Sequence, residues 1–302
     1  MVLMVPIGKK ILHYRKSIDM SQGELAEGIC TQAFVSQIES GNAIPNIVIF
    51  RGLLNRLGVS YEYFFQEERP YASYFDEVEK AIDTLKRKRD YKGIKQFILG
   101  EKNKPCFQHV SGKQYMLWNL GICYTHIDRN IDIAIKHFHD ALAVTGKSVN
   151  SSVLSEREVE ILISIAITSG ETKNYDYAIK LYKKALHVLR DRDQLLDEKI
   201  LIRVYYNLSR TFGLKGNFQD ALNHAWRGKS LCEQYDLLYL RGELLYQVGI
   251  NKVELGYLEQ GISYIEKCLP YFKLDEKNNP AIYEYVENKL KLLKKSLKVC
   301  DL

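Results

Sequence analysis

Two short runs decide the fold of the first part of the chain: MSQGELA at residues 20–26 and FVSQIESG at residues 34–41. Ser21, followed by Glu24 three positions later, forms a capping box, which predicts the start of a helix. Apolar residues three or four positions apart give each run one face to bury, made by Leu25, Ala26 and Ile29 in the first and by Val35 and Ile38 in the second. A glycine ends the second run. The pattern predicts a helix-turn-helix, whose second helix has the size to enter a DNA major groove.

This order of residues resembles the DNA-binding domain of phage repressors and of the Xre family over about residues 7–66. The shared features are the Ser-Gln opening, the Leu-Ala pair, the Val-Ser-x-Ile-Glu-x-Gly run and the later Pro45. The chain departs from many relatives in the turn, where it carries Ile29-Cys30 instead of a small residue. The resemblance implies an Xre-type helix-turn-helix DNA-binding domain at residues 1–66.

Polar side chains on or near the second helix are suited to DNA, because a glutamine amide pairs with adenine and an alanine can meet the thymine methyl group. Gln22 lies at a helix N-terminus, which favours phosphate, and Lys9, Lys10 and Lys16 are further candidates for phosphate contacts. We expect eight residues to form the DNA contact: Arg15, Gln22, Thr31, Gln32, Ala33, Ser36, Gln37 and Asn42. The alternative is that these side chains form an ordinary solvated helix face.

The composition is that of an ordinary soluble protein, with 302 residues, 46% hydrophobic, 26% charged and a formal net charge of +6. Residues 1–66 hold six basic and five acidic residues, so DNA binding would depend on where the charges lie and on dimerisation. Six cysteines without a CxxC pair or zinc spacing indicate reduced thiols in a cytoplasm and no metal. We expect no cofactor, and neither a signal peptide nor a membrane span in the short apolar start at residues 1–6.

A repeat of 40 to 44 residues fills the rest of the chain. Small residues followed by a branched aliphatic residue recur at Gly93, Ala134, Ala178, Ala221 and Gly261. This spacing places a small residue where two helices touch, and WNLGICY at residues 118–124 resembles the tetratricopeptide pattern. We expect an all-α fold, with a connecting helix at residues 67–85 and a tetratricopeptide-like α-solenoid of about five hairpins at residues 86–302, capped by a helix at residues 280–298.

Polar residues recur at steps of four on the first helix of the last three hairpins: Glu160, Ser164, Thr168; Arg203, Asn207, Thr211; Glu243, Gln247, Asn251. We expect them to form the concave wall of the superhelix, where amides can pair with the backbone of an extended peptide. The alternative is a solvated helix face. The second hairpin breaks the pattern with Met116 and Leu120, unless a shift of one residue brings Tyr115 and Asn119 onto the wall.

A repressor-like domain followed by such a solenoid resembles the peptide-pheromone receptors of Gram-positive bacteria, the RRNPP group, and within it the PlcR-like members. The resemblance implies that a short re-imported peptide binds the concave surface and alters how a dimer holds its operator. It assigns Asn207, in a Tyr-Asn pair 14 residues before a repeat helix, to the peptide. The third repeat departs, with Ile163, Ser164 and Ile167 where PlcR-like proteins carry Asn.

We expect the peptide to contact Lys86, Lys88, Ser164, Arg203, Asn207, Glu243, Gln247 and Asn251. The basic run at residues 86–89 can bind a peptide carboxylate or simply end a helix. Cys30 is either a redox switch or a buried inert thiol.

The predicted function is a transcriptional regulator that binds a palindromic double-stranded DNA operator as a cytoplasmic homodimer, away from membranes, under the control of a short signalling peptide or other small ligand. The alternative is a helical-repeat scaffold with a vestigial helix-turn-helix. An enzyme is not expected, because the sequence carries no P-loop, no GxSxG and no HExxH motif.

Overall fold

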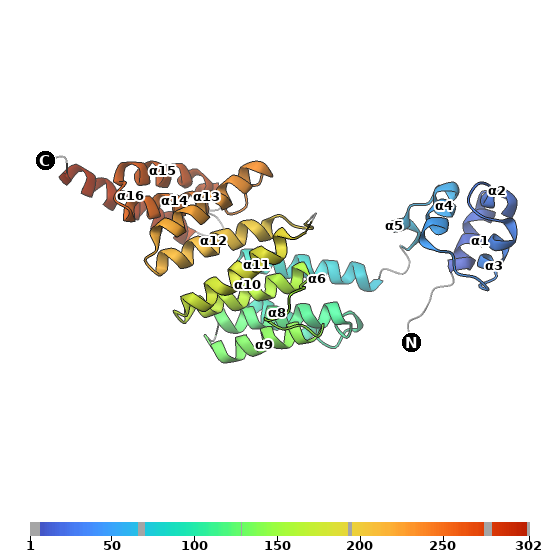
Figure 1. Cartoon of the computed structure of the whole chain (residues 1–302). Coiled ribbons are helices and arrows are strands. Elements are labelled where there is room, and N and C mark those ends of the chain that lie inside the picture. Colours follow the sequence, from blue (N-terminus) through green and yellow to red (C-terminus); the bar gives the residue numbers. More distant parts are fainter. Residues whose placement is uncertain (1–6, 66–69, 128, 193–194, 275–279, 301–302) are drawn as a thin grey trace. The chain divides into compact units, whose positions relative to one another are not determined.

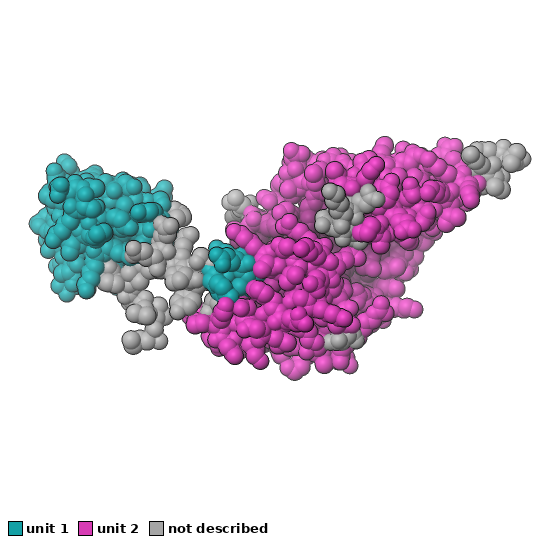
Figure 2. Space-filling view, turned by 180° about the vertical axis from the view of Figure 1, so that it is seen from behind, with its two compact units in different colours: residues 1–79 teal, residues 80–302 magenta. Residues whose placement is uncertain are grey.

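The computed structural model describes residues 7–65, 70–127, 129–192, 195–274 and 280–300; the apolar start at residues 1–6 lies outside them. All regular elements in these ranges are helices (Figure 1), which confirms the all-α prediction. The chain divides into two compact units, residues 1–79 and 80–302 (Figure 2). The division falls inside helix α6 (Pro70–Arg87), in the stretch expected to connect the two parts. The domain limits at residues 66 and 85 stay a prediction.

The first unit begins with five short helices: α1 (Ile7–Ser17), α2 (Gln22–Ala26), α3 (Gln32–Glu39), α4 (Ile47–Leu57) and α5 (Tyr61–Phe64). Their apolar faces meet in one core that includes Ile11, Leu25, Val35, Phe50 and Phe64. Gly8 lets α1 touch the end of α3, because a Cβ atom there would lie 1.8 Å from the carbonyl oxygen of Ile38. The helix-turn-helix is therefore held between α1 and α4.

The local signals of the helix-turn-helix are confirmed, with one correction in the turn. The Ser21 hydroxyl accepts a hydrogen bond from the Glu24 amide at 3.2 Å, and the Ser21 amide donates to the Glu24 carboxylate at 2.7 Å. Helix α2 ends at Ala26, so Ile29 lies in the turn, where it packs against the core. The left-handed step of the turn is made by Gly28, at φ +67°. A glycine, which tolerates this conformation, thus stands one position before Ile29.

The second unit is a stack of helical hairpins (Figure 1). It contains α7 (Tyr91–Glu101), the 3₁₀ helix η2 (Pro105–Phe107), and the packed pairs α8 (Val110–His126) with α9 (Ile131–Ala143), α10 (Glu156–Glu171) with α11 (Tyr175–Arg190), α12 (Lys199–Leu214) with α13 (Phe218–Gln234), and α14 (Arg241–Glu254) with α15 (Leu258–Leu274). Helix α16 (Pro280–Cys300) packs against α15 through Val286 and Leu290. This is the capping helix that the sequence predicted.

The repeat signature marks the second helix of each hairpin. Ala134, Ala178 and Ala221 are fully buried, and each follows by four residues an asparagine whose side chain caps the helix, namely Asn130, Asn174 and Asn217. Gly261 allows a close helix contact, because a Cβ atom there would lie 2.7 Å from the carbonyl oxygen of Gly249.

In the first repeat, the buried repeat position lies one residue later than Gly93, the position that the sequence predicts. The helix is capped by Asp90, so the position four residues after the cap is the fully buried Ile94. A Cβ atom on Gly93 would instead meet the Asp90 carboxylate at 2.4 Å. The first repeat therefore carries a large residue where the next three carry alanine.

The first helices of successive hairpins also touch one another, α8 with α10, α10 with α12 and α12 with α14. They line up as one continuous surface of the second unit. We call this surface the groove wall.

Candidate functional site

Helix α3 presents a polar face to solvent. Thr31, Gln32, Ala33 and Gln37 are exposed, Ser36 is half-buried, and Asn42 is exposed just beyond the helix end. Val35 and Ile38, on the opposite side, are buried in the core. These six polar-side residues, from Thr31 to Asn42, are called the DNA-reading face below. The structure brings them together, whereas their contact with DNA stays a prediction.

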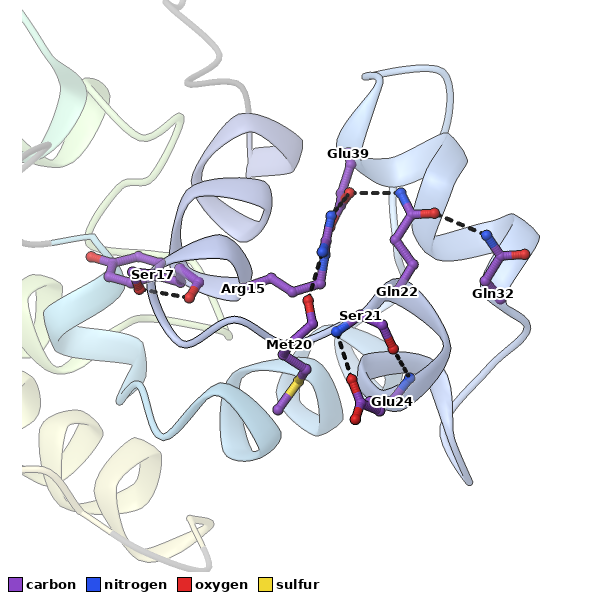
Figure 3. A network of polar contacts seen from close by, with 9 residues as sticks. Arg15, Ser17, Met20, Ser21, Gln22, Glu24, Gln32 and Glu39 are labelled. Carbon is purple, nitrogen blue, oxygen red and sulfur yellow. Dashed lines mark hydrogen bonds and ion pairs between the residues drawn. The ribbon is translucent and has the colours of Figure 1, made fainter.

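A buried ion pair lies beneath this face (Figure 3). Arg15 donates from Nε to Glu39 Oε1 at 2.6 Å and from Nη2 to Oε2 at 2.8 Å, and its Nη1 donates to the Met20 carbonyl at 2.7 Å. Both side chains are buried. The sequence predicts that Arg15 contacts DNA. Its burial and its three internal hydrogen bonds instead make it a structural residue that ties α1 to α3.

Gln22 connects this ion pair to the DNA-reading face. Its Nε2 donates to Glu39 Oε2 at 2.8 Å, and its Oε1 accepts a hydrogen bond from Gln32 Nε2 at 2.9 Å (Figure 3). Burial alone would raise the pKa of Glu39, but the hydrogen bonds from Arg15 and Gln22 and the charge of Arg15 hold it below its ordinary value. Glu39 thus stays ionised and anchors Gln22, which in turn orients Gln32.

Sequence reasoning missed this network, although a signal for it was present. Glu39 stands four residues after Val35 and therefore on the side of α3 that faces the core. A charge in that place requires a buried partner, and Arg15 on α1 supplies it.

Three lysines and one cysteine of the first unit were also named as candidates from the sequence, the lysines for phosphate contacts and the cysteine for a redox switch. Lys9 and Lys16 are exposed, while Lys10 donates from Nζ to the carbonyl oxygen of Phe64 at 2.9 Å and so binds to α5. Cys30 is half-buried, and burial raises the pKa of its thiol. A raised pKa disfavours the reactive thiolate, which supports the inert thiol over the redox switch.

The structure leaves some residues of the predicted polar stripe half-buried on the groove wall and buries the others. Glu160, Ser164, Arg203, Glu243 and Gln247 are half-buried on the wall, but Thr168, Asn207, Thr211 and Asn251 are buried. Helix geometry contributes to this, because each residue turns the helix by about 100° and a step of four therefore drifts by about 40°. Asn207 and Thr211 line neither of the two cavities described below, whereas Thr168 and Asn251, although buried, line one each.

The asparagines of the stripe satisfy their own helices. Asn207 Nδ2 donates to the carbonyl oxygen of Arg203 at 2.9 Å, and Asn251 Nδ2 donates to that of Gln247 at 2.6 Å. The proposed register shift in the second hairpin is also wrong, because Asn119 is fully buried.

Aromatic and aliphatic side chains occupy much of the wall that was expected to be polar. On α8, Trp118 donates from Nε1 to Ser164 Oγ at 2.8 Å, which places Trp118 at the wall. On α12 and α14 the wall positions are taken by Tyr206, Arg210, Tyr246 and Ile250. A pattern of polar residues at steps of four does not predict the aromatic and aliphatic side chains among them.

One end of the wall holds a cavity of about 150 Å³ around Lys86, the Lys86 cavity. The Lys86 ammonium lies 4.6 Å from the centre of the Trp118 ring and 3.7 Å from Asp83 Oδ1. Burial lowers the pKa of Lys86, and so do the positive charges of Arg203 and Arg157, while the carboxylates of Asp83 and Glu160 oppose this. Lys88, also predicted to bind the peptide, is exposed beyond α6 and does not line this cavity.

Arg203 also lines the Lys86 cavity. Its Nη2 donates to Glu160 Oε1 at 3.0 Å, which connects α12 to α10 across the wall. The stripe residues Glu160, Ser164 and Arg203 thus meet Lys86 and Trp118 at one place, although α6 and α12 are far apart in the sequence.

The other end of the wall holds a larger cavity of about 410 Å³ between α12, α14 and α16, the Tyr246 cavity. Tyr246 and Tyr285 meet there in a T-shaped contact with ring centres 6.3 Å apart. Burial, together with Tyr285, raises the pKa of Tyr246. The predicted residues Glu243, Gln247 and Asn251 also line this cavity.

Among the described residues, no group of three or more His, Cys, Asp or Glu side chains is placed to hold a metal ion. Nor does the described part of the chain contain a helix long and apolar enough to cross a membrane.

Models of known protein families match both parts of the chain. Residues 79–294 match the model of the RNPP family C-terminal domain, and residues 11–64 match a helix-turn-helix model. No curated protein matches the chain.

Several solved structures share the fold. PlcR of Bacillus thuringiensis, solved with the peptide PapR7 and DNA, has a TM-score of 0.73 at 20% identity, over 94% of this chain and 98% of that one. The SHP pheromone receptor Rgg2 of Streptococcus dysgalactiae has a TM-score of 0.56 at 14% identity, over 95% and 99%. ComR of S. thermophilus, solved with DNA and its signalling peptide ComS, has a TM-score of 0.51 at 12% identity, over 95% and 99%.

Proposed function

The chain belongs to the RNPP family, whose C-terminal domain covers residues 79–294, and from this we propose that it is a DNA-binding transcriptional regulator controlled by a short peptide. The observation that carries the proposal is the presence of two separate binding surfaces. The first unit has an exposed polar face on α3, and the second has a groove wall with a cavity at each end. Of the proteins with this fold, PlcR and ComR were solved with both DNA and a peptide.

In this proposal the DNA-reading face enters the major groove. Gln32 and Gln37 pair with base edges, Gln22 holds Gln32 in place, and the exposed Lys9 and Lys16 bind phosphates. A single reading helix offers a small footprint, so a homodimer reads a palindrome in double-stranded DNA with half-sites about one helical turn, or a multiple of it, apart. The protein would act in the cytoplasm, where that DNA lies.

The peptide lies along the groove wall of the second unit. A carboxylate of the peptide binds the Lys86 ammonium, which lines the Lys86 cavity together with the side chain of Arg203. Further polar groups along the wall come from Ser164, Arg203 and Gln247, which are all half-buried there. The first unit would then serve as the DNA-binding domain, and the stretch at residues 67–85 as the connection to the regulatory domain.

Two selections on the full-length protein test this function. Fragmented genomic DNA of the source organism is incubated with the protein at low salt, and retained fragments are sequenced. Small peptides that co-purify with the protein are identified by mass spectrometry. We expect a shared palindrome among the fragments and a bound peptide of about five to ten residues. Retention of no DNA would contradict the regulator and favour the scaffold alternative, against which the exposed polar face of α3 argues.

A further inference from the structure

The Tyr246 cavity differs from the Lys86 cavity in size and in lining. Its floor is made of aromatic and aliphatic side chains, contributed by Tyr206, Tyr246, Ile250, Ile282 and Tyr285. A volume of about 410 Å³ lies within the range of small-ligand sites, which are mostly apolar with a few placed polar groups. The capping helix α16 supplies one side of it, so the cavity exists only at this end of the groove.

The two cavities also differ in charge. Lys86 and Arg203 line the smaller one, and Arg157 lies with its guanidinium 5.4 Å from the centre of the Trp118 ring at the same place. The charged residues that line the Tyr246 cavity are Glu243, Glu254 and Arg210, with a net charge of −1.

The polar groups of the Tyr246 cavity lie beside its apolar floor. Glu254 is exposed at the rim, Glu243 and Gln247 are half-buried, and all three belong to α14. An ammonium has three donors and no acceptor, so carboxylate and amide oxygens suit it. A group that fits here combines a large apolar side chain with a positive charge at its base. The first residue of a peptide with an unblocked amino terminus has this combination.

We propose that the Tyr246 cavity binds the first residue of the peptide, with a large apolar side chain on the aromatic floor and the free α-ammonium at Glu254. This rests on the proposed function, since it presumes a peptide in the groove. The bound peptide then runs in one direction, from its amino terminus at α14 and α16 to a carboxylate at Lys86. The receptor accordingly selects peptides by their amino-terminal residue and rejects blocked ones.

The probes are three mixtures of heptapeptides with randomised sequence. The first lacks lysine and has free amino termini, the second is the same mixture with acetylated termini, and the third is acetylated but contains lysine. Each is incubated with the full-length protein, and retained peptides are sequenced by mass spectrometry. We expect the free mixture to be retained about tenfold more than the acetylated one, the size expected for losing a hydrogen-bonded charge. We also expect large apolar residues to be enriched at its first position.

Variants assign the selection to the cavity. Glu254→Gln should reduce retention of the free mixture towards that of the acetylated one, whereas Glu259→Gln, an exposed carboxylate on α15 that does not line the cavity, should change nothing. Ile282→Trp should fill the cavity and abolish enrichment at the first position. Thermal unfolding of each variant checks that it folds, and Glu254→Gln, at an exposed position, carries the test if Ile282→Trp does not.

The outcomes separate the inference from the function it rests on. Equal retention of free and acetylated peptides, a preference for free peptides that is unchanged in Glu254→Gln, or first-position enrichment that survives in a folded Ile282→Trp variant would overturn the amino-terminal assignment and leave the peptide receptor intact. Recovery of retention by lysine in the acetylated mixture would also overturn it, because the ammonium would then come from a side chain. Retention of no peptide from any mixture would contradict the proposed function itself.

Discussion

The helix-turn-helix and the groove wall both present polar groups to a partner, but they hold them in opposite ways. On α3 the glutamines point to solvent, and one of them is fixed from below through Gln22 by the buried Arg15–Glu39 pair. On the wall, the amides of Asn207 and Asn251 donate to carbonyl oxygens of their own helices, and rings such as Tyr206 and Tyr246 line the cavity. An anchored polar network suits a surface that reads bases, and a cavity lined by aromatic rings suits a surface that selects side chains.

The largest effect is expected from breaking the buried ion pair. Glu39→Ala leaves the Arg15 guanidinium buried without its carboxylate, which costs about 3–5 kcal/mol. The first unit should unfold separately, at lower denaturant, while the second keeps its transition, as circular dichroism and tryptophan fluorescence can follow. The double variant Arg15→Met/Glu39→Leu is the control, and it should recover much of the loss. A single unshifted transition in Glu39→Ala would show that the pair does not anchor the unit.

Substitutions on the DNA-reading face should lower specific binding without unfolding the protein. We expect Gln32→Ala and Gln37→Ala each to lose about 1–3 kcal/mol on the selected operator, with little change on random DNA. Gln22→Ala should cost nearly as much as Gln32→Ala, and the double variant little more, because Gln22 acts by orienting Gln32. Fluorescence anisotropy at constant salt measures this. Equal losses on both DNAs would mean that the glutamines touch only phosphates.

The wall offers a matched pair of amides, one on the surface and one turned into its helix. Gln247→Ala should weaken peptide binding by about 1 kcal/mol or more, through loss of a hydrogen bond, and leave the thermal transition in place. Asn207→Ala should instead lower the stability of the second unit by about 1 kcal/mol and change peptide affinity little. Calorimetric titration with the co-purified peptide decides between them. Weaker peptide binding in a stable Asn207→Ala variant would restore the residue to the site.

The two units should also differ in their response to acid, which is the smallest effect. Burial lowers the pKa of His224, stacked on Phe212, to about 4. The unfolded chain therefore binds the proton first, and the second unit loses stability as pH falls from about 6.5 towards 4. Glu39, with its lowered pKa, stabilises the first unit above the ordinary pKa of glutamate, and that contribution is lost only at lower pH.

His224→Phe tests this difference. It should remove part of the acid sensitivity of the second unit, by about 2–4 °C in Tm at pH 4.5, which corresponds to about 1 kcal/mol for a unit of this size. Melting curves at pH 7 provide the reference. An identical pH dependence in wild type and variant would mean that His224 titrates normally.

The helix-turn-helix could be predicted almost residue by residue because its signals are local. The capping box at Ser21 and Glu24 and the apolar face of α3 involve residues three or four apart. The repeat could be predicted as well, because small residues mark most of the hairpins. The exception is the first repeat, where the cap at Asp90 places the repeat position one residue after Gly93. The contacts that determine both sites join residues far apart in sequence.

Three such contacts show why the geometry of the two sites could not be predicted from the sequence. The Arg15–Glu39 pair depends on how α1 crosses α3, and the Lys86 cavity depends on α6 and α8 meeting α12. The Tyr246 cavity requires the capping helix, whose Tyr285 comes about 40 residues after Tyr246. Steps of four placed the first members of each polar stripe on the wall, whereas Asn207 and Thr211 are buried and line neither cavity, because each step drifts by about 40° around the helix.

The central claim is that a peptide on the second unit controls DNA binding by the first. The most direct test is the affinity of the full-length protein for its selected operator, measured by fluorescence anisotropy at constant salt with and without a saturating amount of the co-purified peptide. We predict that the peptide changes the operator Kd at least about tenfold, equivalent to 1.4 kcal/mol of coupling, and leaves the Kd for random DNA nearly unchanged. An operator Kd that stays the same while calorimetry shows the peptide bound would contradict the account.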